Sequence, residues 1–220
     1  MSRDQQITTA LFDLDGVVAF TDKYHYLGWK KLCDERGWKF DQNVNHRLRG
    51  IARMASLDVI LQHNKVSLDN KTKEALADHK NEYYKQMLQQ LSTQDLYPGI
   101  VEFVQALRKR NVKVGLCSAS KNAKFILDRL GITTLFDEVV TGEDIVKAKP
   151  DPEIFLTCAK RLGVQPSHCV VFEDAEAGIE AGLSAGMKCI GVGNRDVLPN
   201  APVNITRYED INIDALLRTC

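Results

Sequence analysis

The chain has 220 residues, 44% of them hydrophobic, which is enough to bury a sizeable core as one domain or as a core with an insert. Lysine plus arginine balances aspartate plus glutamate at 29 each, so no overall charge favours nucleic acid or a membrane surface, and no apolar run could span a bilayer. The polar first residues lack a signal peptide, so we expect a cytoplasmic protein whose scattered cysteines stay reduced: Cys33, Cys117, Cys158, Cys169, Cys189 and Cys220.

The first expected element is a buried strand over residues 7–12, and it ends in two aspartates and a glycine. Side chains alternate along an extended chain, so Asp13 and Asp15 would lie on one side of it. Charges are rarely tolerated at such a position unless they are paired, metal-bound or catalytic. Gly16 permits a tight exit. Two close carboxylates favour a hard cation, and an aspartate can accept a phosphoryl group covalently.

Helical periodicity follows the first strand, from about residue 23 to residue 91. We expect one helix over 26–33 that ends near Gly37, a second over 54–63 and a third from 67 to about 91. The buried stripe of the third helix would carry Leu76, Tyr83, Met87 and Leu91. This segment predicts a small helical bundle inserted after the first strand.

From residue 97 onward, helices and short apolar strands alternate. The expected helices span 98–110, 121–130, 152–162 and 175–185, and the strands span 112–117, 138–140, 168–172 and 188–192. This pattern predicts right-handed crossovers and a doubly wound, Rossmann-like parallel sheet in an α/β protein. We expect an α/β core of residues 1–19 and 95–220, with residues 20–94 as the inserted domain. Ligands of such sheets bind at the C-terminal ends of the strands.

Three more clusters of polar residues lie at such strand ends. Residues 118–122 open a helix and could hold phosphate oxygens, although simple helix capping is the plainer alternative. The lysines of 147–149 could neutralise a phosphate or Asp13, or could merely be solvated. Glu173 and Asp174 offer oxygen ligands for Mg²⁺, or they could cap the next helix and compensate its dipole.

Taken in order, the Asp-x-Asp-Gly, the serine, the Lys-Pro and the Glu-Asp pair resemble the four motifs of the haloacid-dehalogenase-like phosphotransferases. The resemblance covers essentially the whole chain, and the inserted helices are similar to the cap of one subgroup. Residues 12–29, 48–56, 79–81 and 118–122 resemble the β-phosphoglucomutase subgroup within that family.

The resemblance implies a role for each core motif. Asp13 would be the nucleophile that carries an aspartyl phosphate, and Asp15 would be the general acid and base acting on a sugar hydroxyl. Mg²⁺ would be held by the Asp13 carboxylate, the Asp15 main-chain carbonyl, Asp174 and Glu173. The metal would offset the repulsion between an anionic nucleophile and an anionic phosphoryl group.

The resemblance also implies a substrate-binding set. Lys149 and Ser118 would hold the phosphoryl oxygens, Arg53 would bind the distal phosphate of the sugar, and Thr21 would lie in the hinge. The remaining expected substrate-binding residues are His25, Trp29, Gly50, Ile51, Ala52, Ser56, Lys80, Ala119, Ser120, Lys121 and Asn122. The plainer alternatives are a surface position for His25, a solvated Lys80 and a capping role for Arg53.

The chain departs from the pattern of the subgroup around the hinge and the cap loop. Ala19 and Phe20 replace the usual threonine or isoleucine and the usual acidic residue. Arg49 stands where lysine is usual, which keeps the charge but changes its geometry, and Ala52 stands where serine is usual. These changes bear on the hinge and on sugar preference, not on phosphoryl chemistry.

The leading hypothesis is an isomerase that interconverts β-D-glucose 1-phosphate and glucose 6-phosphate through β-glucose 1,6-bisphosphate. One alternative is a Mg²⁺-dependent sugar-phosphate or nucleotide phosphatase with the same core, and another is a mutase for other hexose or disaccharide phosphates. A non-catalytic binding protein on the same fold is the third. We expect a hexose phosphate as the small-molecule partner, no nucleic acid or membrane partner, and a monomer.

Overall fold

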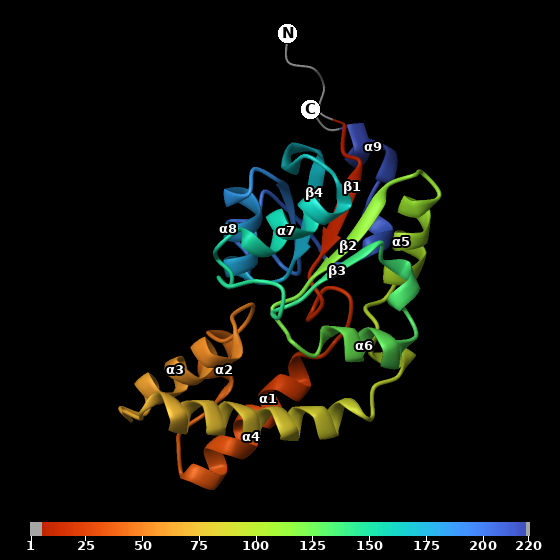
Figure 1. Cartoon of the computed structure of the whole chain (residues 1–220). Coiled ribbons are helices and arrows are strands. Elements are labelled where there is room, and N and C mark those ends of the chain that lie inside the picture. Colours follow the sequence, from red (N-terminus) through yellow and green to blue (C-terminus); the bar gives the residue numbers. More distant parts are fainter. Residues whose placement is uncertain (1–5, 219–220) are drawn as a thin grey trace.

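The computed structural model describes residues 6–218, in which a parallel sheet lies between two layers of helices (Figure 1). The strands are β1 (Thr9–Phe12), β2 (Lys113–Cys117), β3 (Glu138–Val140), β4 (Cys169–Glu173), β5 (Lys188–Val192) and β6 (Val203–Ile205). Their order across the sheet is β3-β2-β1-β4-β5-β6, with every neighbouring pair parallel. The expected doubly wound, Rossmann-like α/β fold is confirmed.

Helices cover both faces of the sheet. Side chains alternate between the two faces along each strand, so neighbouring residues pack against different helices. Ala10 and Phe12 pack with α5 (Ile100–Arg108), α6 (Ala123–Leu130) and α9 (Ile213–Arg218). Leu11 packs on the other face with α7 (Glu153–Leu162) and α8 (Glu176–Ser184). With β1 between β2 and β4 and both faces covered, the residue after β1 lies at the middle of the sheet edge.

The inserted segment folds into α1 (Asp22–Arg36), α2 (Gln42–His46), α3 (Arg53–His63) and α4 (Asn70–Leu88). These helices bury a hydrophobic cluster of their own, which includes Trp29, Leu57 and Leu76. They lie opposite the C-terminal ends of the strands (Figure 1). The two chain segments that connect the inserted helices to the sheet run side by side. Phe20 N donates to Asp95 O at 2.7 Å, and Tyr97 N donates to Val18 O at 2.9 Å.

Several local expectations need correction. Tyr83 is only half-buried and its hydroxyl donates to Glu35, whereas Tyr84 is fully buried in its place. The hydrophobic pattern does not separate two adjacent tyrosines. Helices α2 and α9 and strand β6 were not expected, because each is short. The structure also has 3-10 turns at η1 (Thr93–Asp95), η2 (Thr133–Leu135), η3 (Pro166–His168) and η4 (Tyr208–Asp210).

The thiols of Cys33, Cys117, Cys158, Cys169 and Cys189 are buried and free, as expected. Cys220 lies outside the described residues, and so do residues 1–5, on which the expectation about a signal peptide rests. Within residues 6–218, every helix is too short or too polar to cross a membrane.

Candidate active site

Asp13 lies at the middle of the sheet edge, directly after β1. Its backbone N–H still donates to Phe172 O at 3.0 Å, so the end of β1 is tied to β4. The chain then turns at Gly16, whose φ is +79°. A Cβ there would clash with the Asp174 carboxylate, so this position requires glycine both for its backbone angle and for space. The turn therefore brings the acidic ends of β1 and β4 together.

Lys149 is fully buried between two of these carboxylates. Its Nζ donates to Asp13 Oδ1 and to Glu173 Oε1, each at 2.5 Å, and to Cys117 O at 3.2 Å. Burial alone would lower the pKa of Lys149, but Asp13 and Glu173 raise it above its usual range. Burial raises the pKa of Asp13 to about 8, although Lys149 acts in the opposite direction. The ammonium of Lys149 thus forms ion pairs with two buried carboxylates.

Asp15 faces the inserted helices instead of Lys149. The Thr21 hydroxyl donates to its carboxylate, and His25 Nε2 lies 3.6 Å from Asp15 Oδ1. Burial would raise the pKa of Asp15, but the His25 and Thr21 contacts together lower it below its usual value. Two carboxylates two residues apart therefore have different partners: Asp13 contacts the ammonium of Lys149, whereas Asp15 contacts Thr21 and His25 of the insert.

Lys80 on α4 is 1% exposed and lies beside His25. Its Nζ is 3.0 Å from His25 Nδ1 and lies over the rings of Trp29 and Tyr84, at 5.0 and 4.6 Å from their centroids. Burial, with the charge of Arg53, lowers the pKa of Lys80 to about 7. Burial and the charge of Lys80 also lower the pKa of His25. The alternative of a solvated lysine is therefore wrong, whereas the His25 side chain is partly exposed and lies beside Asp15 and Lys80.

Arg49, just before Gly50, reaches across to the end of β4. Its Nη2 donates to the Asp174 carboxylate, and to Asp22 Oδ2 at 3.1 Å. Burial raises the pKa of Asp174 well above its usual value, even with Arg49 beside it. Sequence reasoning missed this contact. The lysine-to-arginine departure marked the position, but nothing in the sequence pointed to its partners.

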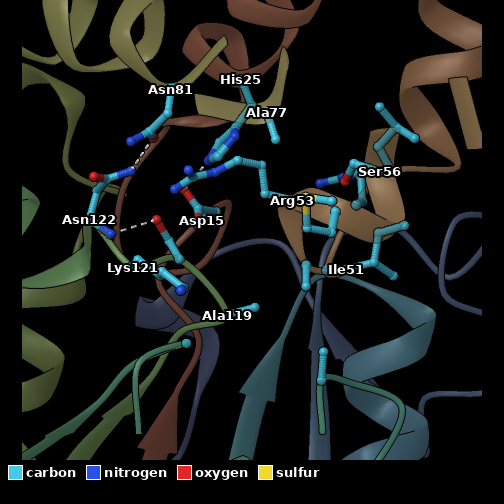
Figure 2. Close-up of a pocket in the computed structure, with 18 of the residues that line it drawn as sticks. Asp15, His25, Ile51, Arg53, Ser56, Ala77, Asn81, Ala119, Lys121 and Asn122 are labelled. Carbon is cyan, nitrogen blue, oxygen red and sulfur yellow. Dashed lines mark hydrogen bonds and ion pairs between the residues drawn. The ribbon is translucent and has the colours of Figure 1, made fainter. Parts of the chain in front are cut away.

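A cavity of about 490 Å³ separates the strand ends from the inserted helices, and both layers line it (Figure 2). This volume lies in the range of pockets for small molecules. Figure 2 shows Asp15, Lys121 and Asn122 on the sheet side and His25 and Arg53 on the helical side. Asn122 Nδ2 donates to Asn81 Oδ1 at 2.9 Å, which joins the two sides at one end.

Most of the expected site residues line this cavity. They are Asp13, Asp15, His25, Trp29, Gly50, Ile51, Ala52, Arg53, Ser56, Lys80, Ala119, Ser120, Lys121, Asn122 and Asp174. Thr21, Ser118, Lys149 and Glu173 are buried behind the lining instead. The Ser118 hydroxyl accepts a hydrogen bond from Ser120 N at 3.1 Å, so it organises the loop above it.

The lining also holds residues that were not among the expected site residues. They are Asp22, Asn45, Leu48, Arg49, Met54, Glu74, Ala77, Asp78, Asn81, Gly142, Ile145, Val146 and Ala148. Val146 is 93% exposed and Met54 is 38% exposed, so the cavity has an apolar rim. A lone exposed valine in a loop carries no sequence signal, whereas Asn81 lies in the segment 79–81 that carries the resemblance and could have been given a role with Lys80.

Comparison with known proteins places this geometry in a family. The model for haloacid dehalogenase-like hydrolases matches residues 7–186, which include the carboxylates at both strand ends. The chain belongs to the haloacid dehalogenase-like hydrolase family.

Several sugar-phosphate enzymes resemble the chain over most of its length. It is 40% identical to β-phosphoglucomutase from Bacillus subtilis (strain 168) over 94% of this chain and 92% of that protein. It is 36% identical to a fructose-1-phosphate phosphatase from Escherichia coli (strain K12), over 83% of this chain and 94% of that protein. A crystal structure of β-phosphoglucomutase from Clostridium difficile superposes with a TM-score of 0.90 at 40% identity, covering 96% and 95% of the two chains.

The residues at the strand ends fit a divalent ion such as Mg²⁺. In the part of the chain that the structure describes, there is no ready-made group of three or more His, Cys, Asp or Glu side chains placed to hold a metal ion. The donors at the strand ends are nonetheless hard oxygens, which Mg²⁺ prefers. Asp13 and Asp174 are buried, and burial is the largest cause of their raised pKa values. A divalent cation would relieve this cost.

Proposed function

We propose that the protein is a β-phosphoglucomutase that interconverts β-D-glucose 1-phosphate and glucose 6-phosphate through an aspartyl-phosphate enzyme. The observation that carries the proposal is a single cavity with Asp13 on the sheet side and Arg53 on the helical side. A hexose bisphosphate needs one phosphate site at each end of its pocket. The similarity to two β-phosphoglucomutases supports the same reaction.

The chemistry follows from the two aspartates. In one half-reaction, Asp15 takes the proton of the C6 hydroxyl as that oxygen attacks the phosphorus on Asp13 and the bond to the Asp13 carboxylate breaks. The product is β-glucose 1,6-bisphosphate, which turns over in the cavity. Asp13 then attacks the C1 phosphate, the bond to the sugar oxygen breaks, and Asp15 returns its proton to that oxygen. The lowered pKa of Asp15 suits it to begin as a base.

The charges around Asp13 support this role. Lys149 would offset the negative charge of the transferring phosphoryl group, and Arg53, with Ser120, Lys121 and Asn122, would hold the distal phosphate. Asp13, the Asp15 carbonyl, Glu173 and Asp174 would hold Mg²⁺. When bound, the ion supplies positive charge to the phosphoryl oxygens and favours in-line geometry.

We also propose residues 20–94 as a cap domain and residues 1–19 and 95–220 as the core domain. The separate hydrophobic cluster of α1 to α4 and the paired connections at Phe20 and Tyr97 support this division. A cap that closes over the cavity would keep water from the phosphoenzyme, which a mutase needs and a phosphatase does not.

The test is an assay with separate readouts for isomerisation and hydrolysis. Protein, Mg²⁺, β-glucose 1-phosphate and a trace of β-glucose 1,6-bisphosphate should give glucose 6-phosphate with little inorganic phosphate. Release of phosphate without glucose 6-phosphate would contradict the mutase.

The similarity to the E. coli fructose-1-phosphate phosphatase favours a sugar-phosphate phosphatase as the second candidate. To test this candidate, a panel of hexose 1-phosphates and 6-phosphates is assayed for release of inorganic phosphate. Phosphate release without isomerisation indicates the phosphatase. The apolar rim at Met54 and Val146 makes the panel worth extending to disaccharide phosphates.

A further inference from the structure

Arg49 connects the helical insert to a carboxylate that the proposed function gives to the metal. Its guanidinium bridges Asp22, at the start of α1, and Asp174, at the end of β4. Asp174 is 6% exposed. Among the described residues, it forms its ion pair with Arg49. The Nε of Arg49 is buried without a hydrogen-bond partner in the described structure, so the guanidinium forgoes one bond to keep this position.

The neighbouring backbone brings Arg49 to this place. Gly50 has φ +72°, and a Cβ there would lie 2.7 Å from the Cβ of Ala175. The cap loop therefore lies directly on the loop after β4, one residue from Asp174. Arg49 and Asp174 are 125 residues apart in sequence, so this contact exists only when the cap lies against the core.

We propose that Arg49 is a positioning residue that occupies Asp174 when no metal is bound, so that Mg²⁺ and the Arg49 contact compete for one carboxylate. The inference rests on the proposed function, in which Asp174 is a metal ligand. Asp22 is the second acceptor, and it keeps the guanidinium beside the site when the metal takes Asp174. Couplings between binding events are reciprocal. If the Arg49–Asp174 contact lowers the affinity for Mg²⁺, then bound Mg²⁺ weakens the Arg49–Asp174 contact by the same factor. The metal-free cap is thus held to the core, and the metal frees it to respond to substrate.

The test measures Mg²⁺ binding without substrate, by isothermal titration calorimetry, in the whole protein and three variants. Arg49→Gln removes the cation and should lower the Kd for Mg²⁺ by about fivefold or more, the usual lower range of such couplings. Arg49→Lys keeps the charge but replaces the planar guanidinium with a shorter side chain that ends in a compact ammonium, so its Kd should lie between the two. Arg47→Gln removes an exposed charge two residues away and is the matched control, with an unchanged Kd.

A second readout separates this role from a structural one. Small-angle scattering should show a Mg²⁺-dependent increase in the radius of gyration of the wild-type protein. Arg49→Gln should already have the larger radius without metal and should change little on adding it. Thermal unfolding of each variant checks that it is folded, and Arg49→Lys supplies the comparison if Arg49→Gln is not.

The outcomes distinguish this inference from the proposed function. Equal Mg²⁺ affinity in the wild type, Arg49→Gln and Arg49→Lys would overturn the competition while leaving the metal-dependent function in place. A Kd for Arg47→Gln that falls as much as that for Arg49→Gln would reduce the effect to general charge and would also overturn it. Absence of Mg²⁺ binding in the wild type and in both Arg49 variants would overturn the proposed metal site and, with it, the inference.

Discussion

At the scale of single residues, this site depends on how one fold gives similar side chains different proton affinities. Asp13 and Asp15 are two residues apart, yet burial raises the pKa of one while His25 and Thr21 lower that of the other. Lys149 and Lys80 are both fully buried, yet carboxylates raise the pKa of Lys149 whereas burial dominates for Lys80. Position relative to neighbouring charges, and not residue type, sets each role.

The first prediction concerns Asp13. Asp13→Asn should lower kcat by at least about a thousandfold, because the substitution removes the group that accepts the phosphoryl group. The protein should stay folded, since Lys149 keeps Glu173 as a partner. Steady-state kinetics and a thermal melt measure the two effects, with Asp34→Asn on the exposed side of α1 as the control. Turnover of Asp13→Asn at the wild-type rate would refute the nucleophile assignment.

The second prediction concerns Lys80, whose pKa in the folded protein is about 7 against an ordinary value of 10.5. Below pH 7 the buried ammonium is charged in both states, so the folded state bears the full cost of burying it. Between about pH 7 and pH 10.5 only the unfolded state keeps the proton, so the free energy of unfolding should rise with pH across that window. Lys80→Met should therefore stabilise the protein most below pH 7, by on the order of 3 kcal/mol.

Urea unfolding at about pH 6 and about pH 9 tests this linkage. The gain from Lys80→Met should shrink at the higher pH. Lys85→Met, at an exposed position on the same helix, should change stability little at either pH. A gain of the same size at both pH values would show that lost charge burial is not its cause.

At the scale of elements, the site is made by loops that follow strands and by a helical layer that closes on them. β1 and β4 deliver their carboxylates to the same sheet edge, and α1 and α4 deliver His25 and Lys80 from the other side. The two layers touch at Asn81 with Asn122 and at Gly50 with Ala175. These small contacts set the distance between the inserted helices and the sheet at this end of the cavity.

The third prediction separates backbone strain from cap contact. Gly50→Ala should destabilise the protein by about 1–2 kcal/mol because its φ is +72°, and should raise KM for the sugar phosphate because the added Cβ meets Ala175. Gly37→Ala has a similar φ of +66° but open space around the Cβ. The control should lose similar stability with an unchanged KM. Equal effects of both variants on KM would contradict the contact argument.

At the scale of the whole molecule, a chain with no net charge concentrates acids at one sheet edge. Asp13, Asp15, Glu173 and Asp174 lie there with Lys149 and Arg49 as partners. Crowding these carboxylates costs stability, as is common at functional sites, and a further cation would offset that cost. The hydrophobic layers on both faces of the sheet hold the strand ends in place against that repulsion.

The fourth prediction is that Mg²⁺ stabilises the protein against heat. At about a hundred times its Kd the ion should contribute about 2.7 kcal/mol, which corresponds to roughly 5–10 °C in Tm for a chain of this size. Differential scanning fluorimetry with Mg²⁺ or with EDTA measures the shift. Asp174→Asn should lose most of it, and an undiminished shift in that variant would place the ion elsewhere.

The sequence by itself determined the fold class and the alternation of the longer strands and helices, and it predicted most of the polar residues that line the cavity. Short apolar strands alternating with helices leave few topologies, and polar motifs at strand ends must meet at one edge. Periodicity could not separate Tyr83 from Tyr84, nor reveal short elements such as β6, because their patterns are weak over few residues.

Only the tertiary structure decided which charges pair. The motif predicts Asp174 as a metal ligand, but its contact with Arg49 depends on where the inserted helices lie relative to the sheet. Lys80 among polar neighbours reads as a surface lysine, yet α1 and α4 enclose it between aromatic rings. Local sequence specifies local conformation, whereas burial and charge pairing arise between segments that only the packed fold brings together.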